Sequence, residues 1–225
     1  MLMLHGYMSC KESFFYSILY FSRFYRVTAP DFPGFGASSP IPAAWSVGDY
    51  AAWLKDFISA AGMKRPHVIA HSFGARVAIK LAAAYPQLFG RMVITGGAGV
   101  LKPRTRAYRR KVATYRLVKK FAPRLAEKKF GSAEYKKLCP LMRESYKKIV
   151  NEDLLADAGK IQIPVLLIYG AEDTVTPAAE EGLAFARAMP HGRLAVIEGG
   201  HFAFSQNHNV FNSTAAQFFA GNGDI

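Results

Sequence analysis

The chain places a serine on a predicted turn between a buried strand and a helix, in Ala70-His71-Ser72-Phe73-Gly74. Residues 66–70 are short and apolar, as in a core strand, and residues 75–85 carry apolar side chains at helical spacing. A sharp turn between such elements lifts the serine hydroxyl above the sheet edge, in the arrangement called a nucleophile elbow. The usual pattern is Gly-x-Ser-x-Gly, and alanine replaces its first glycine here. Taken alone, the pentapeptide is equally compatible with a serine that caps an ordinary helix.

Strand-like and helix-like segments alternate along most of the chain. Apolar runs predict strands at 1–5, 25–30, 66–71, 91–96, 163–169 and 193–198. Helical spacing predicts helices near 12–22, 46–61, 74–85, 177–189 and 207–220. Such alternation is typical of an α/β fold, with a mostly parallel, doubly wound sheet covered by helices on both faces.

Two more polar residues follow predicted strands directly. Asp173 comes just after the apolar run 165–170, and His201 comes after the run 194–197 and Gly199-Gly200. The carboxyl ends of parallel strands share one edge of a sheet, and sites assemble there. The sequence therefore predicts that Ser72, Asp173 and His201 meet at this edge.

The three residues occur along the chain in the order serine, acid, histidine. This order and four motifs together resemble the α/β-hydrolase family over nearly the whole chain. Besides the serine pentapeptide and the histidine, residues 31–38 (Asp-Phe-Pro-Gly-Phe-Gly-Ala-Ser) resemble the family's D-x-P-G-x-G-x-S loop, and residues 170–173 (Gly-Ala-Glu-Asp) resemble its acid loop. The resemblance implies an α/β-hydrolase core at 1–100 and 159–225. It also implies a helical lid at 101–158, where no strand signal occurs.

The resemblance further implies a catalytic triad. Ser72 is expected to act as nucleophile, His201 as its general base, and Asp173 as the group that orients the imidazole. Other acids stay open as substitutes for Asp173; they are Glu172, Asp157 and Asp153.

Two backbone N–H groups are expected to form an oxyanion hole. The elbow supplies that of Phe73, and the loop after His5-Gly6 supplies a second, from Tyr7 with Met8 as the rival.

Further side chains near these motifs have expected roles. Arg76, one turn into the helix, is a candidate for binding a substrate carboxylate, with an ordinary exposed or salt-bridged arginine as the alternative. Phe202 and Phe204, which lie close to His201 in the sequence, are expected either to line the pocket or to fill the core. His5 is expected to organise its loop, and Asp31 to fix the turn that follows it.

One departure from the family concerns the start of the chain. Family members usually carry two further strands and a hairpin before the His-Gly motif, whereas this chain begins at that motif. On the family's usual strand order, the predicted strand 25–30 then becomes a sheet edge. Unpaired edges invite pairing with another chain, so poor solubility or self-association through this edge is predicted.

Positive charge is concentrated in one segment. The chain has a net charge of +13, and residues 101–150 hold 17 Lys and Arg against three acids, so the remainder is close to neutral. Three readings of this segment stay open: a solvated surface, attraction of anionic substrates, or contact with an acidic membrane surface. Because the charge is local, binding of nucleic acid is not predicted.

Composition narrows the class of protein. A chain of 225 residues that is 51% hydrophobic and 13% aromatic fits one globular domain and not a disordered protein. No apolar run approaches the ~20 residues that cross a bilayer. No basic and apolar leader precedes His5, and Cys10 and Cys139 are expected to be free thiols, so the sequence predicts a cytoplasmic protein.

No cofactor is predicted. Neither cysteine has Cys or His neighbours at metal-ligand spacing, and Gly34-x-Gly36 does not complete a nucleotide-binding loop. These features together predict a serine hydrolase that cleaves a small-molecule ester, or a related acyl bond, through an acyl-enzyme. The alternatives are a thioesterase, a carbon–carbon hydrolase of the meta-cleavage type, and a non-catalytic binding protein with the same fold. A weaker alternative is a membrane-surface module.

Overall fold

A computed structural model of the chain describes residues 1–101, 106, 110, 113–114, 135 and 138–221. Most of the predicted lid at 101–158 lies outside these described residues, so the division into core and lid stays a prediction. Its last part is described and contains helix α7 (Pro140–Val150) and the short helix α8 (Leu155–Ala158).

The centre of the fold is a five-stranded parallel sheet in the order β1-β2-β3-β4-β5. The strands are β1 (Leu2–Leu4), β2 (Val68–His71), β3 (Met92–Thr95), β4 (Val165–Gly170) and β5 (Gly192–Ile197). Every neighbouring pair is parallel. All carboxyl ends therefore share one edge, and the predicted parallel α/β architecture is confirmed.

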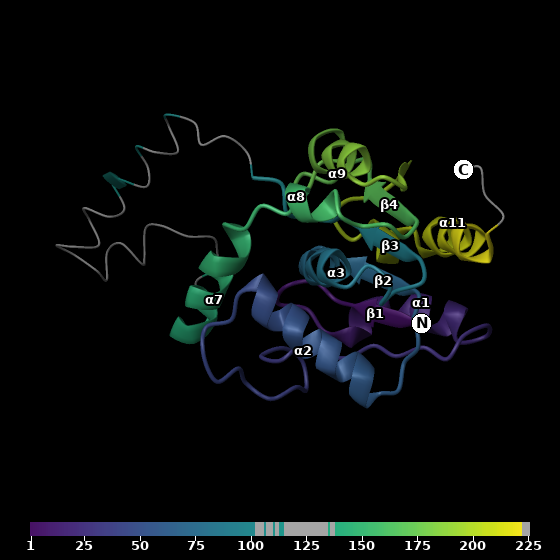
Figure 1. The fold of residues 1–225 in the computed structure, drawn as a ribbon. Coiled ribbons are helices and arrows are strands. Elements are labelled where there is room, and N and C mark those ends of the chain that lie inside the picture. Colours follow the sequence, from purple (N-terminus) through teal and green to yellow (C-terminus); the bar gives the residue numbers. More distant parts are fainter. Residues whose placement is uncertain (102–105, 107–109, 111–112, 115–134, 136–137, 222–225) are drawn as a thin grey trace.

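Helices cover both faces of this sheet (Figure 1). One face carries α2 (Val47–Ala60), α3 (Phe73–Ala84), α8 and α9 (Leu183–Ala188). The other carries α1 (Phe15–Phe21), α10 (Ala203–Gln206) and α11 (His208–Ala220). Two short helical turns, η1 (Lys11–Phe14) and η2 (Ala178–Gly182), precede α1 and α9.

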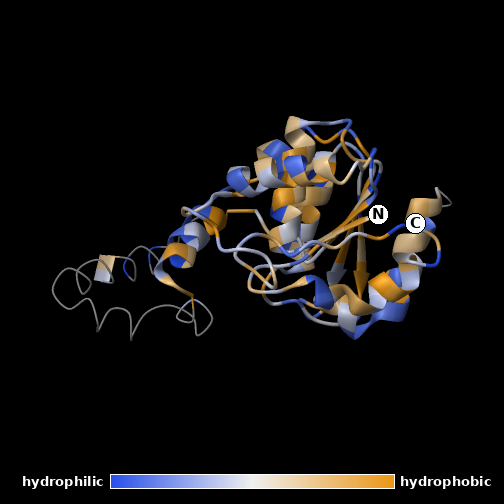
Figure 2. Cartoon of the chain, turned by 90° about the horizontal axis from the view of Figure 1, so that it is seen from below, coloured by the Kyte–Doolittle hydropathy of each residue, from blue (hydrophilic) through white to orange (hydrophobic). Residues whose placement is uncertain are grey.

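Side chains of each strand alternate between two apolar cores. In β1, Leu2 and Leu4 pack with α2 and α3, whereas Met3 packs with α1 and α11. In β2, Ile69 joins the second core in the same way. Strands β1 to β4 are buried on both faces and are mostly apolar, as the orange colour of the central strands in Figure 2 shows, whereas the edge strand β5 is only partly buried.

The predicted strand at 25–30 is wrong. In this segment only Thr28 forms a bridge, and its partner is Leu2. The Thr28 N–H donates to the Met1 oxygen, and the Thr28 oxygen accepts from the Met3 N–H, both at 2.9 Å. In a parallel ladder the next donor along this segment would be the N–H of residue 30. That residue is Pro30, which has no N–H, so the ladder stops after one bridge.

Two smaller findings concern the described residues. Cys10 and Cys139 are both free thiols. None of the described helices combines the length and the hydropathy needed to cross a bilayer.

Candidate active site

Ser72 lies on a strained turn between β2 and α3. Its backbone has φ +49° and ψ −104°, a conformation that non-glycine residues rarely adopt. The turn is tight because α3 packs very close to β1: a Cβ on Gly74 would lie 2.3 Å from the Leu4 oxygen. The Ser72 side chain makes no capping bond to α3, which argues against a mere helix cap.

Three side chains that are distant in the sequence meet beyond the carboxyl ends of β2, β4 and β5. The Oγ of Ser72 lies 3.1 Å from Nε2 of His201, and Nδ1 of His201 lies 2.8 Å from Oδ2 of Asp173. The aspartate side chain is fully buried, whereas the His201 side chain keeps 13% of its surface exposed. This arrangement can pass a proton from the hydroxyl to the imidazole.

The carboxylate of Asp173 is held by several donors. Oδ1 accepts from the N–H groups of Val175 and Thr176 at 2.8 and 2.9 Å, and Oδ2 accepts from the Thr176 hydroxyl at 2.8 Å in addition to His201. Burial alone would raise the pKa of Asp173, but the bonds from His201 and Thr176 outweigh it and lower that pKa. An ionised carboxylate can therefore stabilise a cationic imidazole.

The alternative acids do not take this position. Asp157 pairs with Lys80 and Lys160, and Asp153 accepts from the N–H groups of Leu101 and Leu155. Glu172 is exposed next to Asp173, and its side chain is not among the partners of the imidazole.

Two residues that the sequence reasoning missed also hold the site. Thr176 carries the hydroxyl just described, and its Oγ1 is also 3.2 Å from Nδ1 of His201. His71, directly before Ser72, is buried and its Nε2 lies 3.0 Å from the main-chain oxygen of His201. Because a carbonyl only accepts, Nε2 carries the hydrogen, and Nδ1 is buried without a hydrogen-bond partner. Burial, followed by the nearby His201, lowers the pKa of His71 to about 3.

The loop after β1 runs against the elbow. A Cβ on Gly6 would lie 2.8 Å from Nδ1 of His71 and 3.6 Å from Cβ of Ser72. Tyr7 follows directly, and its ring packs on that of Phe73, with the ring centroids 5.4 Å apart. Phe73 is the first residue of α3, so its N–H belongs to the positive end of that helix.

His5 and Asp31 organise neighbouring loops. Nδ1 of His5 lies 2.7 Å from the Gly6 oxygen and its Nε2 accepts from the Phe32 N–H at 3.0 Å, so the ring ties two loops together. Asp31 accepts from the Lys11 N–H, from the Lys11 ammonium and from the Ala37 N–H.

Arg76 joins helix α3 to the end of α7. The guanidinium is buried, and its Nη1 donates to the main-chain oxygens of Ile149 and Glu152 at 3.0 and 3.1 Å. Arg76 therefore anchors the end of α7 to α3. This bonding favours a structural role, and the binding of a substrate carboxylate stays a prediction.

Phe202 and Phe204 lie in different environments. Phe202 is 46% exposed and lies beside His201, with ring centroids 5.6 Å apart. Phe204 is buried against Phe14 in the core under α1. Phe202 is thus available to contact a ligand, and Phe204 fills the core.

Helix α7 lies across the loops that surround Ser72. The Tyr7 hydroxyl donates to the Met142 oxygen at 2.9 Å, and Ser145 Oγ donates to the Trp45 oxygen at 2.6 Å. The Tyr7 ring also packs on Phe35 and Tyr146, with centroids 4.8 and 5.2 Å away. An aromatic wall therefore lies between α7 and the elbow.

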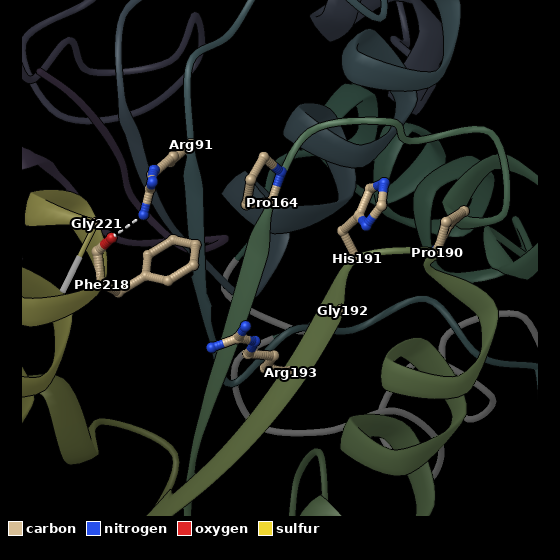
Figure 3. Close-up of a pocket in the computed structure, with 8 residues that line it drawn as sticks. All are labelled: Arg91, Pro164, Pro190, His191, Gly192, Arg193, Phe218 and Gly221. Atoms are coloured by element: carbon tan, nitrogen blue, oxygen red, sulfur yellow. Dashed lines mark hydrogen bonds between the residues drawn. The ribbon is translucent and has the colours of Figure 1, made fainter. Parts of the chain in front are cut away.

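A separate hollow of about 410 Å³ lies at the amino ends of the strands, opposite the carboxyl ends where Ser72 lies (Figure 3). Its lining includes Arg91, Pro164 and Gly192, which stand at the amino ends of β3, β4 and β5. Arg91 donates to the Phe218 oxygen at the end of α11. Because Ser72 lies beyond the carboxyl ends, this hollow is not part of the candidate active site.

Comparison with known proteins gives a family match. A family profile described as "Alpha/beta hydrolase family" matches residues 1–213. A curated relative from a Pseudomonas species, named 2-hydroxy-6-oxononadienedioate/2-hydroxy-6-oxononatrienedioate hydrolase, is 27% identical; the alignment covers 87% of this chain and 77% of the relative.

Solved structures are similar over almost the whole chain. An esterase from Exiguobacterium antarcticum superposes with a TM-score of 0.75 at 19% identity, covering 96% of this chain and 90% of the esterase. A meta-cleavage product hydrolase from Pseudomonas fluorescens IP01 superposes with a TM-score of 0.74 at 23% identity, covering 99% and 90% of the two chains. These likenesses support the same α/β-hydrolase fold.

Proposed function

The chain belongs to the alpha/beta hydrolase family, and from this premise we propose that it is a serine hydrolase that cleaves a carboxylic ester or a related acyl bond through an acyl-enzyme on Ser72. The observation that carries the proposal is the pair of contacts made by His201, at 3.1 Å to the Ser72 hydroxyl and 2.8 Å to Asp173. A hydroxyl, a base and an orienting carboxylate are the groups that this chemistry needs.

In the first half of the reaction, Ser72 Oγ attacks the substrate carbonyl and its proton moves to Nε2 of His201. The resulting imidazolium is stabilised by ionised Asp173, which accepts the Nδ1–H. His201 then gives the proton to the leaving alcohol, and the bond between acyl carbon and leaving oxygen breaks. The acyl group stays on Ser72 as an ester.

In the second half, water takes the place of the alcohol. His201 removes a proton from the water as its oxygen attacks the acyl carbon, and returns it to Ser72 Oγ as the acyl–enzyme bond breaks. The products are a carboxylic acid and free enzyme. In both halves, negative charge develops on the carbonyl oxygen, and the N–H groups of Tyr7 and Phe73 are the proposed donors to it.

A fluorophosphonate probe tests this function directly, because it labels only an activated serine. The expected result is labelling of the wild-type chain that disappears in Ser72→Ala and is strongly reduced in His201→Ala. Folded wild-type protein that is not labelled would instead support the non-catalytic binding protein. Turnover of p-nitrophenyl esters of graded chain length would then define the size of the acyl group.

A second candidate is hydrolysis of a carbon–carbon bond next to a ketone. It is favoured by the names of the Pseudomonas relative and of the meta-cleavage product hydrolase, which describe this kind of enzyme. The same three side chains could serve it. Parallel assays with a p-nitrophenyl ester and a 2-hydroxy-6-oxo-dienoate separate the two: the larger kcat/KM identifies the reaction, and both activities must disappear in Ser72→Ala.

A further inference from the structure

The side chain of Tyr7 connects two parts of the site that have separate roles. Its main chain lies on the loop that follows β1, next to Gly6, which closely approaches Ser72. Its hydroxyl reaches helix α7 and donates to the Met142 oxygen at 2.9 Å, across 135 positions in the sequence. One residue therefore joins a proposed oxyanion donor to a helix from a distant segment.

Packing against other aromatic rings holds the Tyr7 side chain in this position. The Tyr7 ring meets Phe35 and Phe73 edge to face, at centroid distances of 4.8 and 5.4 Å, and meets Tyr146 of α7 at 5.2 Å. Rings packed at these distances stabilise one orientation. Burial raises the pKa of Tyr7, so the hydroxyl keeps its hydrogen and remains a donor through the neutral range.

Other hydrogen bonds also fasten α7, but they do not reach this loop. Ser145 Oγ donates to the Trp45 oxygen at 2.6 Å, Lys148 Nζ donates to the Ala44 oxygen at 2.6 Å, and Arg76 holds the end of the helix. The Tyr7 hydroxyl, by contrast, bonds to α7 from the loop that carries a proposed oxyanion donor. The position of α7 and that of the Tyr7 N–H are thus mechanically linked.

We propose that the Tyr7 hydroxyl is a positioning group, which fixes the oxyanion N–H of the same residue by tying its loop to α7. The inference rests on the proposed function, because it assumes that this N–H meets the developing oxyanion. A donor that shifts by a fraction of an ångström loses much of its effect on the transition state and little of its effect on ground-state binding. Loss of the hydroxyl should therefore lower kcat and leave KM nearly unchanged.

The test compares Tyr7→Phe with the matched variant Ser145→Ala. Each removes one hydroxyl that donates to a main-chain oxygen and fastens α7, but only Tyr7 lies on the oxyanion loop. For Tyr7→Phe we expect kcat to fall about 5- to 20-fold, less than the ~10²-fold typical of deleting a donor outright, with KM within about twofold. For Ser145→Ala we expect both constants within about twofold of the wild type.

A second measurement reports on the oxyanion hole itself. An arylboronic acid adds to Ser72 as a tetrahedral anion, so its inhibition constant should rise in Tyr7→Phe by about the factor by which kcat falls. Circular dichroism melting of both variants confirms that folded proteins are compared. Equal losses in the two variants, a change confined to KM, or an unchanged boronic acid inhibition constant would each overturn the inference.

Wild-type labelling separates this inference from the function on which it rests. If the fluorophosphonate probe does not label Ser72 in the wild type, the proposed function itself fails. If it does label Ser72 and Tyr7→Phe behaves like Ser145→Ala, the function stands and only the positioning role of Tyr7 is lost.

Discussion

His71 donates the hydrogen of its Nε2 to the main-chain oxygen of His201 over 3.0 Å. The buried ring of His71, the last residue of β2, therefore holds the loop that carries His201 at a fixed distance from Ser72. Burial, followed by the nearby His201, lowers the pKa of His71 to about 3, so the ring is neutral in the folded protein near pH 7. The stability of the protein should consequently depend on pH through this residue.

Below neutral pH, His71 should make the fold less stable. The unfolded chain takes up a proton at His71 near pH 6.5, whereas the folded chain takes it up only near pH 3, so stability is complete above pH 6.5 and declines between these values. The decline is about 1.4 kcal/mol per pH unit. Between pH 7 and 5, urea unfolding of the wild type should lose about 2 kcal/mol more than that of His71→Asn, which has no such titration. Equal losses in both proteins would contradict the assignment.

Thr176→Val should destabilise the protein by removing a donor to the Asp173 carboxylate. A hydrogen bond to a charged group contributes about 1.5–3 kcal/mol. Because the donors lower the pKa of Asp173, this contribution is present above the ordinary pKa of aspartate and is lost as pH falls through the folded value. The difference in unfolding free energy from wild type should thus be largest near pH 7 and shrink below about pH 4. Thr176→Ser, which keeps the hydroxyl, is the control and should stay close to wild type.

Asp173→Asn should leave the fold intact and nearly abolish turnover. An amide in place of the carboxylate favours the wrong tautomer of His201 and no longer stabilises the imidazolium, a change that costs about 10⁴-fold in kcat in a serine protease triad. We expect a loss of about 10³- to 10⁴-fold, measured as kcat on the best p-nitrophenyl ester. Asp153→Asn, at a rejected alternative acid, should retain most of the activity, and a comparable loss there would argue against Asp173.

Arg76→Met should affect stability and not substrate preference. It removes the bonds to the Ile149 and Glu152 oxygens while keeping a long side chain, so we expect a loss of about 1–3 kcal/mol in urea unfolding. The ratio of kcat/KM between an anionic and a neutral ester of the same length should not change. A selective loss with the anionic ester would restore the substrate-binding role that the sequence suggested.

Much of this fold is predictable because local signals agree with the tertiary structure. Strands β1 to β4 are mostly apolar on both faces, and Ser72, Asp173 and His201 each follow a strand closely, so a parallel sheet is enough to bring them to one edge. The helices around α2, α3 and α11 have the expected spacing and limits within a few residues.

The parts that could not be predicted depend on contacts between distant segments. The strand expected at 25–30 is apolar enough, but its pairing fails because Pro30 stands where the next donor is needed. The burial of Arg76 depends on where α7 ends, and no motif specifies that position. His71 was overlooked because a histidine before the serine gains its partner only when β5 and the loop after it are in place.

The hollow at the amino ends of β3, β4 and β5 has a practical consequence for experiments. His191 and Arg193 line it on the side of the sheet away from Ser72. With the free thiols Cys10 and Cys139 replaced by serine, a fluorescent dye or a solid support attached through a cysteine introduced at His191 would stand clear of the groups proposed to react. Immobilised or single-molecule assays built on that attachment point should record turnover at the rate found for the protein in free solution.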